Sequence, residues 1–248
     1  MAEPGSADER VQQYADYVRS PLGWLRDELL RHHLAAHGGP PPLRVLDAGC
    51  GLGALGLALA RAGHEVVLVD AAPAMIARVR QAAQAEAEAV QQRIGVVVAD
   101  LHDLPATVTA QPYQVILCHN VLEFSPQPAR LLTQLGNLLV PGGGVSLLVA
   151  NRASDPLKTA LTTQNLRQAR KLLDAHFQAS MFGPKRNFTP GEVAALCLDA
   201  GLTPHTTRPI RVVADLLPLP LLNDVAQRES LLALEISLSE QPEYQQIG

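Results

Sequence analysis

The sequence predicts an α/β fold built on a doubly wound, mostly parallel sheet with helices on both faces, and three observations lead to this prediction. Short apolar runs such as VVLV and GVVV alternate with amphipathic stretches, which is the order of elements in βαβ units. These runs are continuous, as in strands that are buried on both faces of a sheet. A glycine-rich turn, DAGCGLG, directly follows the first apolar run, and such turns join a strand to a helix at ligand sites.

Two helices are expected before the sheet, between Val11 and His37. Apolar residues recur there at intervals of three and four, and Ser20-Pro21 interrupts the pattern, because proline cannot continue a helix interior. The run GGPPP at 38–42 then ends the helical region and leads into the first strand.

The central part of the chain alternates strands and helices. Each strand is a short apolar run, and the helix that begins at Pro73 is rich in alanine, the strongest helix former. The sequence PGGG at 141–144 predicts a turn. The expected strands are Leu43–Ala48, Glu65–Asp70, Ile94–Ala99, Tyr113–His119 and Val145–Ala150. The expected helices are Ala54–Ala62, Pro73–Gln92 and Pro128–Leu139.

The pattern changes after Asn151 to a basic and mostly helical stretch. A helix over Pro190–Ala200, a strand over Thr203–Val213 and a helix over Asp224–Gln241 are expected to follow. No strand-like segment comes after this last helix. The last strand of the sheet is therefore expected to be missing, which would leave strand 203–213 poorly paired.

Composition excludes several classes of protein. Apolar residues make up 47% of the chain and charged residues 18%, which is a globular balance and not a disordered one. No apolar run approaches the roughly 20 residues of a membrane span, and the start MAEPGSADER resembles no targeting peptide. The three cysteines have no metal-ligand spacing, so no metal site is expected, and their odd number favours a reducing compartment, the cytoplasm.

Three acids at strand ends accompany the glycine turn. Asp47 comes just before the glycines, Asp70 ends the second strand about 20 residues past the turn, and Asp100 follows the third strand. Asp70 is placed to accept hydrogen bonds from two ribose hydroxyls, and Asp100 lies at the height of an adenine amino group. Each acid could instead cap a helix, but their joint occurrence with G-x-G-x-G favours a nucleoside site.

These residues resemble a known family. The motif DAGCGLG, Asp70, the sequence ADL around Asp100 and the PGGG before the fifth strand look like a class I S-adenosylmethionine-dependent methyltransferase. The resemblance implies a Rossmann-like methyltransferase fold with S-adenosylmethionine as cofactor. It implies Gly49, Cys50 and Gly51 at the amino acid end of the cofactor, Asp70 on its ribose, and Asp100 with Leu101 around its adenine.

The stretch CHNVLEFSPQP at 118–128 narrows the resemblance. It stands where some relatives carry Asn/Asp-Pro-Pro-Tyr/Phe, so methylation of base amino nitrogens is disfavoured. It is similar to the bacterial tRNA 5-carboxymethoxyuridine methyltransferases, which esterify the carboxylate of a wobble uridine. In that subfamily the arginine of a G-x-L-R motif meets the cofactor carboxylate, which implies this role for Arg26 in GWLR. His119 would lie beside the cofactor, where it could line the methyl-transfer site or cap the next helix.

A carboxylate acceptor would make limited demands on the protein. With a pKa near 4 it is already ionised at pH 7, so no general base is needed and no catalytic residue is assigned. Cations would hold it, preferably a bidentate guanidinium. The candidates are Lys185, Arg186, Arg208 and Arg211. Arg211 is favoured because it lies in RPIRVV, which looks familial, whereas a plain surface charge is the favoured interpretation of Lys185.

The distribution of charge along the chain indicates what kind of molecule it could bind. The chain has a formal net charge of −4, yet residues 152–211 hold 9 basic and 4 acidic side chains. A locally basic segment fits docking of a tRNA anticodon arm, although a solvated helical face would look the same.

The expected organisation is a single methyltransferase domain over residues 1–248. It comprises N-terminal helices at 1–38, a cofactor-binding core at 43–150 and a substrate-side elaboration at 151–248. Two other functions stay open: a methyltransferase of a small acid or quinone-type metabolite, and a protein that binds S-adenosylmethionine without catalysis. The oligomeric state is left open.

Overall fold

A computed structural model describes residues 6–37, 39–245 and 247. Its strands are β1 (Arg44–Ala48), β2 (Glu65–Asp70), β3 (Ile94–Val98), β4 (Tyr113–His119), β5 (Leu139–Leu148), β6 (Phe177–Ser180) and β7 (Gly183–Arg186). Its α-helices are α1 (Ala7–Arg19), α2 (Pro21–His37), α3 (Ala54–Arg61), α4 (Pro73–Gln84), α5 (Glu88–Gln91), α6 (Ala106–Thr109), α7 (Pro128–Gly136), α8 (Asp155–Thr163), α9 (Leu166–Lys171), α10 (Pro190–Asp199), α11 (Leu219–Asn223) and α12 (Arg228–Ser239). None of the described helices is long and apolar enough to cross a membrane.

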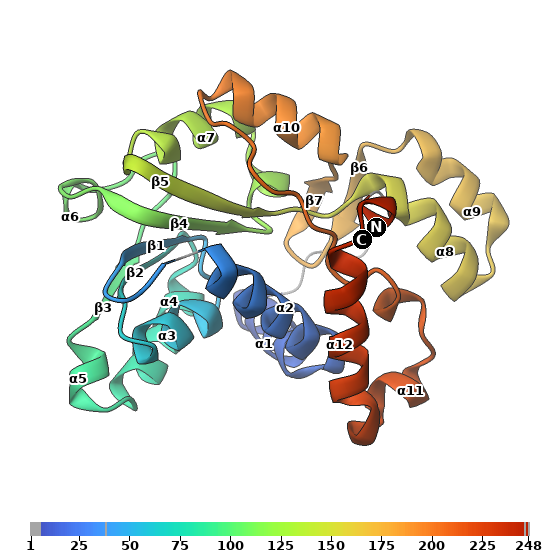
Figure 1. Cartoon of the computed structure of the whole chain (residues 1–248), viewed down its shortest axis with the longest axis horizontal. Helices are drawn as coiled ribbons and strands as arrows, with labels where there is room; N and C mark the ends of the chain where they lie inside the picture. The colour runs from blue at the N-terminus through green and yellow to red at the C-terminus, as the bar shows by residue number, and fades with distance from the viewer. Residues whose placement is uncertain (1–5, 38, 246, 248) are drawn as a thin grey trace.

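The five strands β1 to β5 form one parallel sheet in the order β3-β2-β1-β4-β5 (Figure 1). Strand β1 is central, and its Val45 lies between Val66 of β2 and Val115 of β4. The chain winds from β1 outward to β3 and then returns to β4 on the other side of β1. This reversal creates a crevice at the carboxyl ends of β1 and β4, which is where open α/β sheets bind their ligands.

Both faces of the sheet are covered, as the continuous apolar strands predict. Alternate residues of β1 take part in different cores, because successive side chains of a strand point to opposite faces. Leu46 packs with α6, α7 and α10, whereas Val45 packs with α3 and α4. The predicted doubly wound, mostly parallel fold is thus confirmed.

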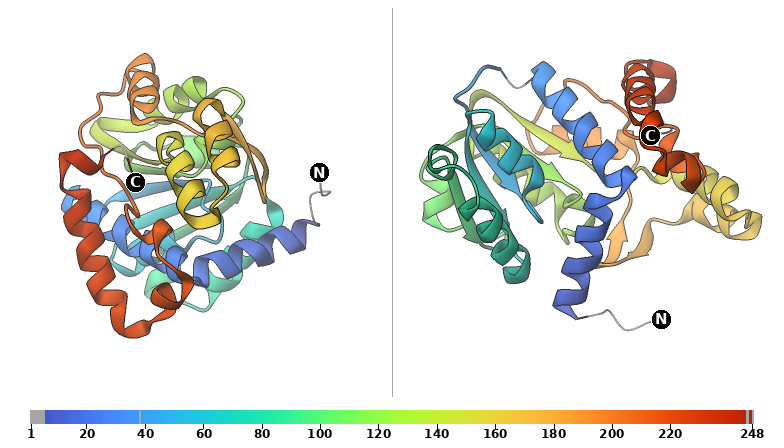
Figure 2. Two further views of the ribbon diagram at one scale, coloured as in Figure 1. Left: turned by 90° about the vertical axis from the view of Figure 1, so that its right-hand side faces the viewer. Right: turned by 90° about the horizontal axis from the view of Figure 1, so that it is seen from below.

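A third apolar cluster joins the two ends of the chain. Leu25 and Leu29 of α2 are fully buried against Ala214 and Leu222, and Ile236 of α12 packs beside them. Helix α12 therefore lies along α2, while α8 and α9 project to the side of the sheet (Figures 1 and 2). The N-terminal and C-terminal helices of the chain thus pack against each other.

Several elements differ from the prediction in their limits. The helix expected over 128–139 ends at Gly136, and the one expected over 224–241 runs from Arg228 to Ser239. The helix expected over 73–92 breaks after Gln84 into α4 and the short α5. The sequence PGGG at 141–144 is not a turn before the fifth strand but lies within β5, which begins at Leu139. The register between β4 and β5 shifts there, since Tyr113 pairs with Leu139 and Val115 with Gly144. The extra residues form a bulge, which glycines tolerate because they add no side chain to the crowded ladder.

The strand expected over 203–213 is not formed. Residues 202–209 run without regular structure, and among the described residues β5 ends the sheet. A strand needs a neighbour to satisfy its backbone groups, and the structure pairs none of the described segments with this one. An antiparallel hairpin of β6 and β7, which the sequence analysis missed, instead follows α9.

Candidate functional site

A large cavity of about 1910 Å³ opens at the carboxyl edge of the sheet. Pockets for drug-sized ligands commonly measure roughly 300–1,000 Å³, so a cofactor and an acceptor could lie in it together. The loops after β1, β2, β3 and β4 form one side of the cavity, and α1, α2, the β6–β7 hairpin and residues 201–211 contribute to the other.

The glycine turn after β1 brings bare backbone to the cavity. Gly49 and Gly51 have φ of 81° and 55°, in the left-handed region that other residues rarely adopt. A Cβ on Gly49 would lie 2.3 Å from Cγ2 of Val121, and one on Gly51 would lie 2.9 Å from Cε1 of Tyr14. Glycine is therefore required at both positions by conformation and by space.

Asp70 is held in place at the end of β2. Its Oδ2 accepts a hydrogen bond from the Gly51 amide at 2.9 Å, and its Oδ1 accepts one from the Ala72 amide at 2.8 Å. Burial raises the pKa of Asp70, and these two hydrogen bonds oppose that effect. Each carboxylate oxygen retains a free acceptor position, so the side chain could receive two hydroxyl groups from one ligand.

Asp100 and Leu101 lie next along the same edge. Oδ1 of Asp100 accepts a hydrogen bond from the His102 amide at 2.8 Å, which makes a local turn after β3. Leu101 is buried in the core and still lines the cavity. The His102 ring is held by Ser125, with 3.1 Å between Nε2 and Oγ. These residues form a partly apolar wall with one carboxylate, which suits a flat base with an exocyclic amino group.

Arg26 of α2 supplies a cation to the cavity wall. Its guanidinium pairs with Asp27 at 2.8 Å and lies over the ring of Tyr17, 5.1 Å from the centroid. His119, at the end of β4, is close enough to respond to this charge. Burial, with a smaller contribution from Arg26, lowers the pKa of His119 to about 3. The imidazole is therefore neutral at pH 7, and its Nε2 lies 2.9 Å from Oγ of Ser146.

Aromatic rings close one side of the cavity. Phe182 lies in the turn between β6 and β7. Its ring meets the rings of Tyr14 and Phe124 edge to face, with 5.6 Å and 6.0 Å between the ring centroids. Tyr14 also stacks on Tyr17 at 6.1 Å. The hairpin thereby contacts α1 across the glycine turn.

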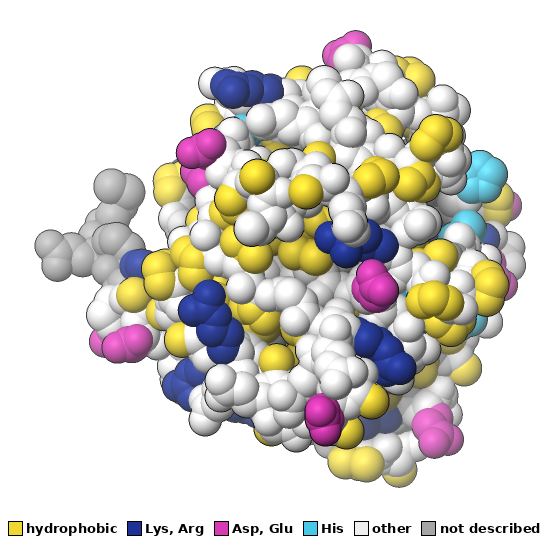
Figure 3. Space-filling view, turned by 90° about the vertical axis from the view of Figure 1, so that its left-hand side faces the viewer, with side chains coloured by type: hydrophobic (Ala, Val, Ile, Leu, Met, Phe, Trp, Pro, Cys, Tyr) yellow, Lys and Arg dark blue, Asp and Glu magenta, His cyan; other side chains and the backbone are white. Residues whose placement is uncertain are grey.

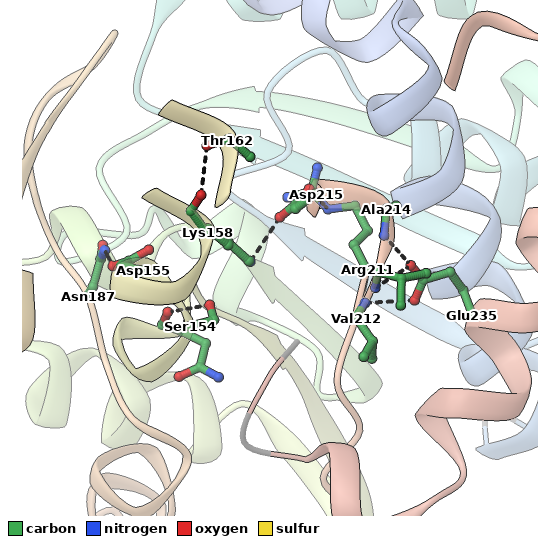
Figure 4. A network of polar contacts seen from close by, with 12 residues as sticks. Ser154, Asp155, Lys158, Thr162, Asn187, Arg211, Val212, Ala214, Asp215 and Glu235 are labelled. Carbon is green, nitrogen blue, oxygen red and sulfur yellow. Dashed lines mark hydrogen bonds and ion pairs between the residues drawn. The ribbon is translucent and has the colours of Figure 1, made fainter. Parts of the chain in front are cut away.

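A cluster of charged residues from α8 and from residues 211–215 also lines the cavity (Figure 4). The Arg211 guanidinium pairs with Asp215 through Nε at 3.4 Å and donates from Nη1 to Oη of Tyr17 at 3.2 Å. Asp215 in turn pairs through Oδ2 with Nζ of Lys158 on α8, at 2.9 Å. The single carboxylate of Asp215 is thus shared by two cations, so these three side chains carry a net charge of +1.

The structure brings most of the predicted residues together. Nine of them line the one cavity: Arg26, Gly49, Gly51, Asp70, Asp100, Leu101, His119, Arg208 and Arg211. Arg208 lies apart from Arg211, where its Nη1 donates to the Ser239 carbonyl at 3.3 Å.

Two predicted residues do not line this cavity. Cys50 packs against the core beneath α3 and α4, where burial raises the pKa of its thiol. Arg186 lies over the ring of Phe188, 4.9 Å from the centroid. Lys185, interpreted as a surface charge, does line the cavity, and its charge lowers the pKa of Glu123 in part.

Sequence reasoning missed Lys158, Asp215 and the aromatic residues of the site. Lys158 and Asp215 lie 57 residues apart on segments with no shared motif. The only signal for Lys158 was its membership of the basic segment. Tyr14 and Tyr17 are three residues apart and belong to the apolar spacing that predicted a helix in this region. Nothing in that spacing distinguished them from residues that only pack.

The residues present fit S-adenosylmethionine. Gly49 and Gly51 leave a space that a Cβ would fill, Asp70 has two free acceptor positions for ribose hydroxyls, and Arg26 offers a guanidinium for a carboxylate. Among the described residues, no three His, Cys, Asp or Glu side chains are grouped so as to hold a metal ion.

Comparison with known proteins identifies several relatives. A family described as "Methyltransferase domain" matches residues 45–143. A tRNA 5-carboxymethoxyuridine methyltransferase of Escherichia coli strain K12 is 39% identical over 132 residues, which are 52% of this chain and 49% of that protein. The chain thus matches about half the length of that relative. A ubiquinone biosynthesis O-methyltransferase of Xanthomonas axonopodis pv. citri strain 306 is 31% identical over 191 residues, 76% of this chain and 74% of that protein.

Solved structures share the fold at low sequence identity. The glycopeptide N-methyltransferase MtfA superposes with a TM-score of 0.56 at 15% identity, covering 75% of this chain and 83% of that one. An S-adenosylmethionine-dependent methyltransferase from Mesorhizobium loti gives a TM-score of 0.51 at 20% identity, with coverages of 64% and 74%. This chain therefore belongs to the S-adenosylmethionine-dependent methyltransferases, as the relative from Xanthomonas and the matching methyltransferase domain show, and S-adenosylmethionine is its cofactor.

Proposed function

We propose that this chain transfers a methyl group to a carboxylate, and that the acceptor is 5-carboxymethoxyuridine at the wobble position of a tRNA. The cofactor supplies an electrophilic methyl group, and the protein orients both reactants, since in-line methyl transfer depends chiefly on alignment. In this proposal Gly49, Gly51 and Arg26 hold the amino acid end of the cofactor. Asp70 binds its ribose, and Asp100 with Leu101 contacts its adenine.

Two features of the cavity carry the proposal together: the cations Arg211 and Lys158 on its wall, and a histidine, His119, that is a poor base. Arg211 and Lys158 share the single carboxylate of Asp215, so the cluster can attract an acceptor that arrives already negative. His119, with a pKa of about 3, is a weak proton acceptor at pH 7. A carboxylate needs no deprotonation at that pH, whereas a hydroxyl acceptor would. Arg211 can hold a carboxylate through two parallel N–H donors.

The lobe formed by α8, α9 and the β6–β7 hairpin is the part of the chain that we expect to contact RNA. Arg167, Arg170 and Lys171 are exposed on α9, and no described acid forms an ion pair with them. Phe177, 66% exposed on the hairpin, offers a ring on which an unstacked base could lie. On the face shown in Figure 3, Lys and Arg side chains are instead mixed with Asp and Glu side chains. Docking through the lobe would bring the anticodon loop to the cavity.

A second candidate is methylation of a hydroxyl group on a small quinone-type molecule. The relative from Xanthomonas, whose printed name is ubiquinone biosynthesis O-methyltransferase, aligns with 76% of this chain. Glu123 also lines the cavity and is 4% exposed, and burial raises its pKa. Its Oε1 accepts the Ala150 amide at 2.8 Å, whereas its Oε2 has no partner among the described residues. A carboxylate of this kind could take a proton from a hydroxyl.

The decisive experiment offers both acceptors to the purified protein. One sample contains tRNA that carries 5-carboxymethoxyuridine, a second the same tRNA with plain uridine, and a third a dihydroxylated aromatic ring with an isoprenoid chain. We expect transfer of labelled methyl from S-adenosylmethionine only to the first, as an ester released by mild alkali. Transfer to the aromatic hydroxyl alone would refute the proposal in favour of the second candidate.

Two variants separate acceptor recognition from RNA docking. Arg211→Ala should abolish the preference for the carboxylated tRNA while leaving the dependence of affinity on salt nearly unchanged. Arg167→Ala should keep the preference and reduce the slope of log K against log salt by about 1, because one phosphate contact is lost. If Arg211→Ala altered only the salt slope, Arg211 would be a phosphate contact and not the carboxylate ligand.

A further inference from the structure

The backbone at Arg211 adopts a conformation that its side chain disfavours. Its φ is 61°, and Asn120 and Gln164 are the other described non-glycine residues with positive φ. Left-handed backbone brings Cβ close to the following carbonyl, so most residues adopt it only where surrounding contacts hold them. The residues that follow Arg211 supply such contacts.

Glu235 of α12 binds three successive backbone amides just after Arg211. Its Oε2 accepts a hydrogen bond from the Val212 amide at 2.7 Å, and its Oε1 accepts from Val213 at 3.0 Å and from Ala214 at 2.7 Å (Figure 4). Glu235 is 1% exposed. A buried carboxylate is costly unless it is fully hydrogen-bonded, and successive N–H groups that converge on one anion satisfy it well.

The helix that carries Glu235 is itself firmly anchored. Ile236 and Leu232 of α12 pack in the apolar cluster with Leu25 and Leu29 of α2. The carboxylate therefore occupies a defined position relative to α2, the helix that also bears Arg26. Arg26 is thus carried by α2, and Arg211 lies next to amides that α12 binds, so both are positioned by the same pair of packed helices.

We propose that Glu235 is a positioning residue for acceptor recognition: by binding the amides of residues 212–214 it holds the left-handed backbone of Arg211 and so places the guanidinium on the cavity wall. Glu235 does not line the cavity and acts only through Arg211. With the backbone held, the guanidinium meets Asp215 and Tyr17. This inference rests on the proposed function, because Arg211 is taken as the ligand of the acceptor carboxylate.

The test uses Glu235→Gln, which keeps the size of the side chain. The amide nitrogen of glutamine would face one of the three N–H donors, so at least one buried amide would lose its acceptor. We expect the KM for carboxylated tRNA to rise about tenfold, a typical effect of losing a hydrogen bond to a charged group. The kcat and the affinity for S-adenosylmethionine should stay within twofold of the native values.

Ser239→Ala is the matched control on the same helix. Ser239 is 2% exposed, and its hydroxyl donates to the Ile236 carbonyl at 2.7 Å, away from residues 211–214. It should lower thermal stability without raising KM. In an Arg211→Ala background, Glu235→Gln should cause no further rise in KM, since the two residues act on one interaction. Additive effects, or an unchanged KM in Glu235→Gln, would overturn the proposal.

A second measurement does not depend on the acceptor. The Nε–H signal of Arg211, assigned by its loss in Arg211→Lys, should exchange with solvent at least several times faster in Glu235→Gln, because the pair with Asp215 loosens. Unchanged exchange would overturn the positioning role whatever the acceptor is. If the native protein methylates no carboxylated tRNA while the exchange rate rises as expected, the proposed function fails and the positioning role stands.

Discussion

Replacement of Asp70 tests the cofactor site most directly. The carboxylate has both oxygens engaged with backbone amides, at 2.9 Å from Gly51 and 2.8 Å from Ala72. Each oxygen can accept one more donor, so two ribose hydroxyls would bind to a side chain that is already in position. A hydrogen bond to a charged group contributes about 1.5–3 kcal/mol. Because every 1.4 kcal/mol is a factor of ten, loss of even one such bond in Asp70→Ala should weaken cofactor binding about 10- to 150-fold.

Isothermal titration with S-adenosylhomocysteine would measure this change, and two further variants interpret it. Asp70→Asn keeps one carbonyl oxygen and should lose less affinity than alanine. Asp103→Ala removes an exposed carboxylate on the neighbouring loop, outside the cavity, and should bind normally. If Asp70→Ala bound within twofold of the native protein, Asp70 would have no part in ribose recognition and would serve only to hold the glycine turn.

Two further predictions concern the turn and the strand beneath it. Gly49→Ala should lose about 1–3 kcal/mol of unfolding free energy, from a φ of 81° and a clash with Val121, whereas Gly144→Ala, whose Cβ meets open space, should melt normally. Equal melting temperatures would refute the steric argument. Burial raises the pKa of Asp47 to about 7, with a smaller effect from Asp70. Because the folded protein binds this proton more tightly than the unfolded chain, the protonated Asp47 stabilises the fold fully below about pH 4, and this stabilisation is lost as the pH rises through 7. Asp47→Asn should therefore gain up to about 4 kcal/mol on the native protein between pH 4.5 and 7.5 in urea titrations, and parallel pH profiles would contradict this.

The elements that sequence reasoning predicted well are those with a strong local cause. The strands β1 to β4 are apolar runs that end in a turn or an acid, and their buried faces follow from covering on both sides. The glycines after β1 could be predicted because only glycine permits φ values of 81° and 55°. Most of the residues predicted to bind the cofactor also line the one cavity at the end of these strands.

The parts that could not be predicted depend on contacts between distant segments. The segment 203–213 has the apolar and β-branched residues of a strand, yet a strand forms only where a neighbour accepts its hydrogen bonds. Lys158 pairs with Asp215, 57 positions away, and Glu235 binds the Val212 amide, 23 positions away. No periodicity encodes such a pairing. The hairpin of β6 and β7 is a local pairing, but the residues that follow it are joined to a distant segment, since Asn151 bridges to Phe188.

The free edge of β5 has a consequence for aggregation. An edge strand presents unpaired N–H and C=O groups that can recruit a strand from another molecule. In the described part of the sheet β5 has a neighbour on one side only. Pro141 and Gly142, both exposed, interrupt that edge, because proline offers no N–H and the left-handed Gly142 turns the backbone out of line. The sequence PGGG at 141–144 thus shortens the part of β5 to which a strand of another molecule could add. In this way it limits self-association through the edge of the sheet.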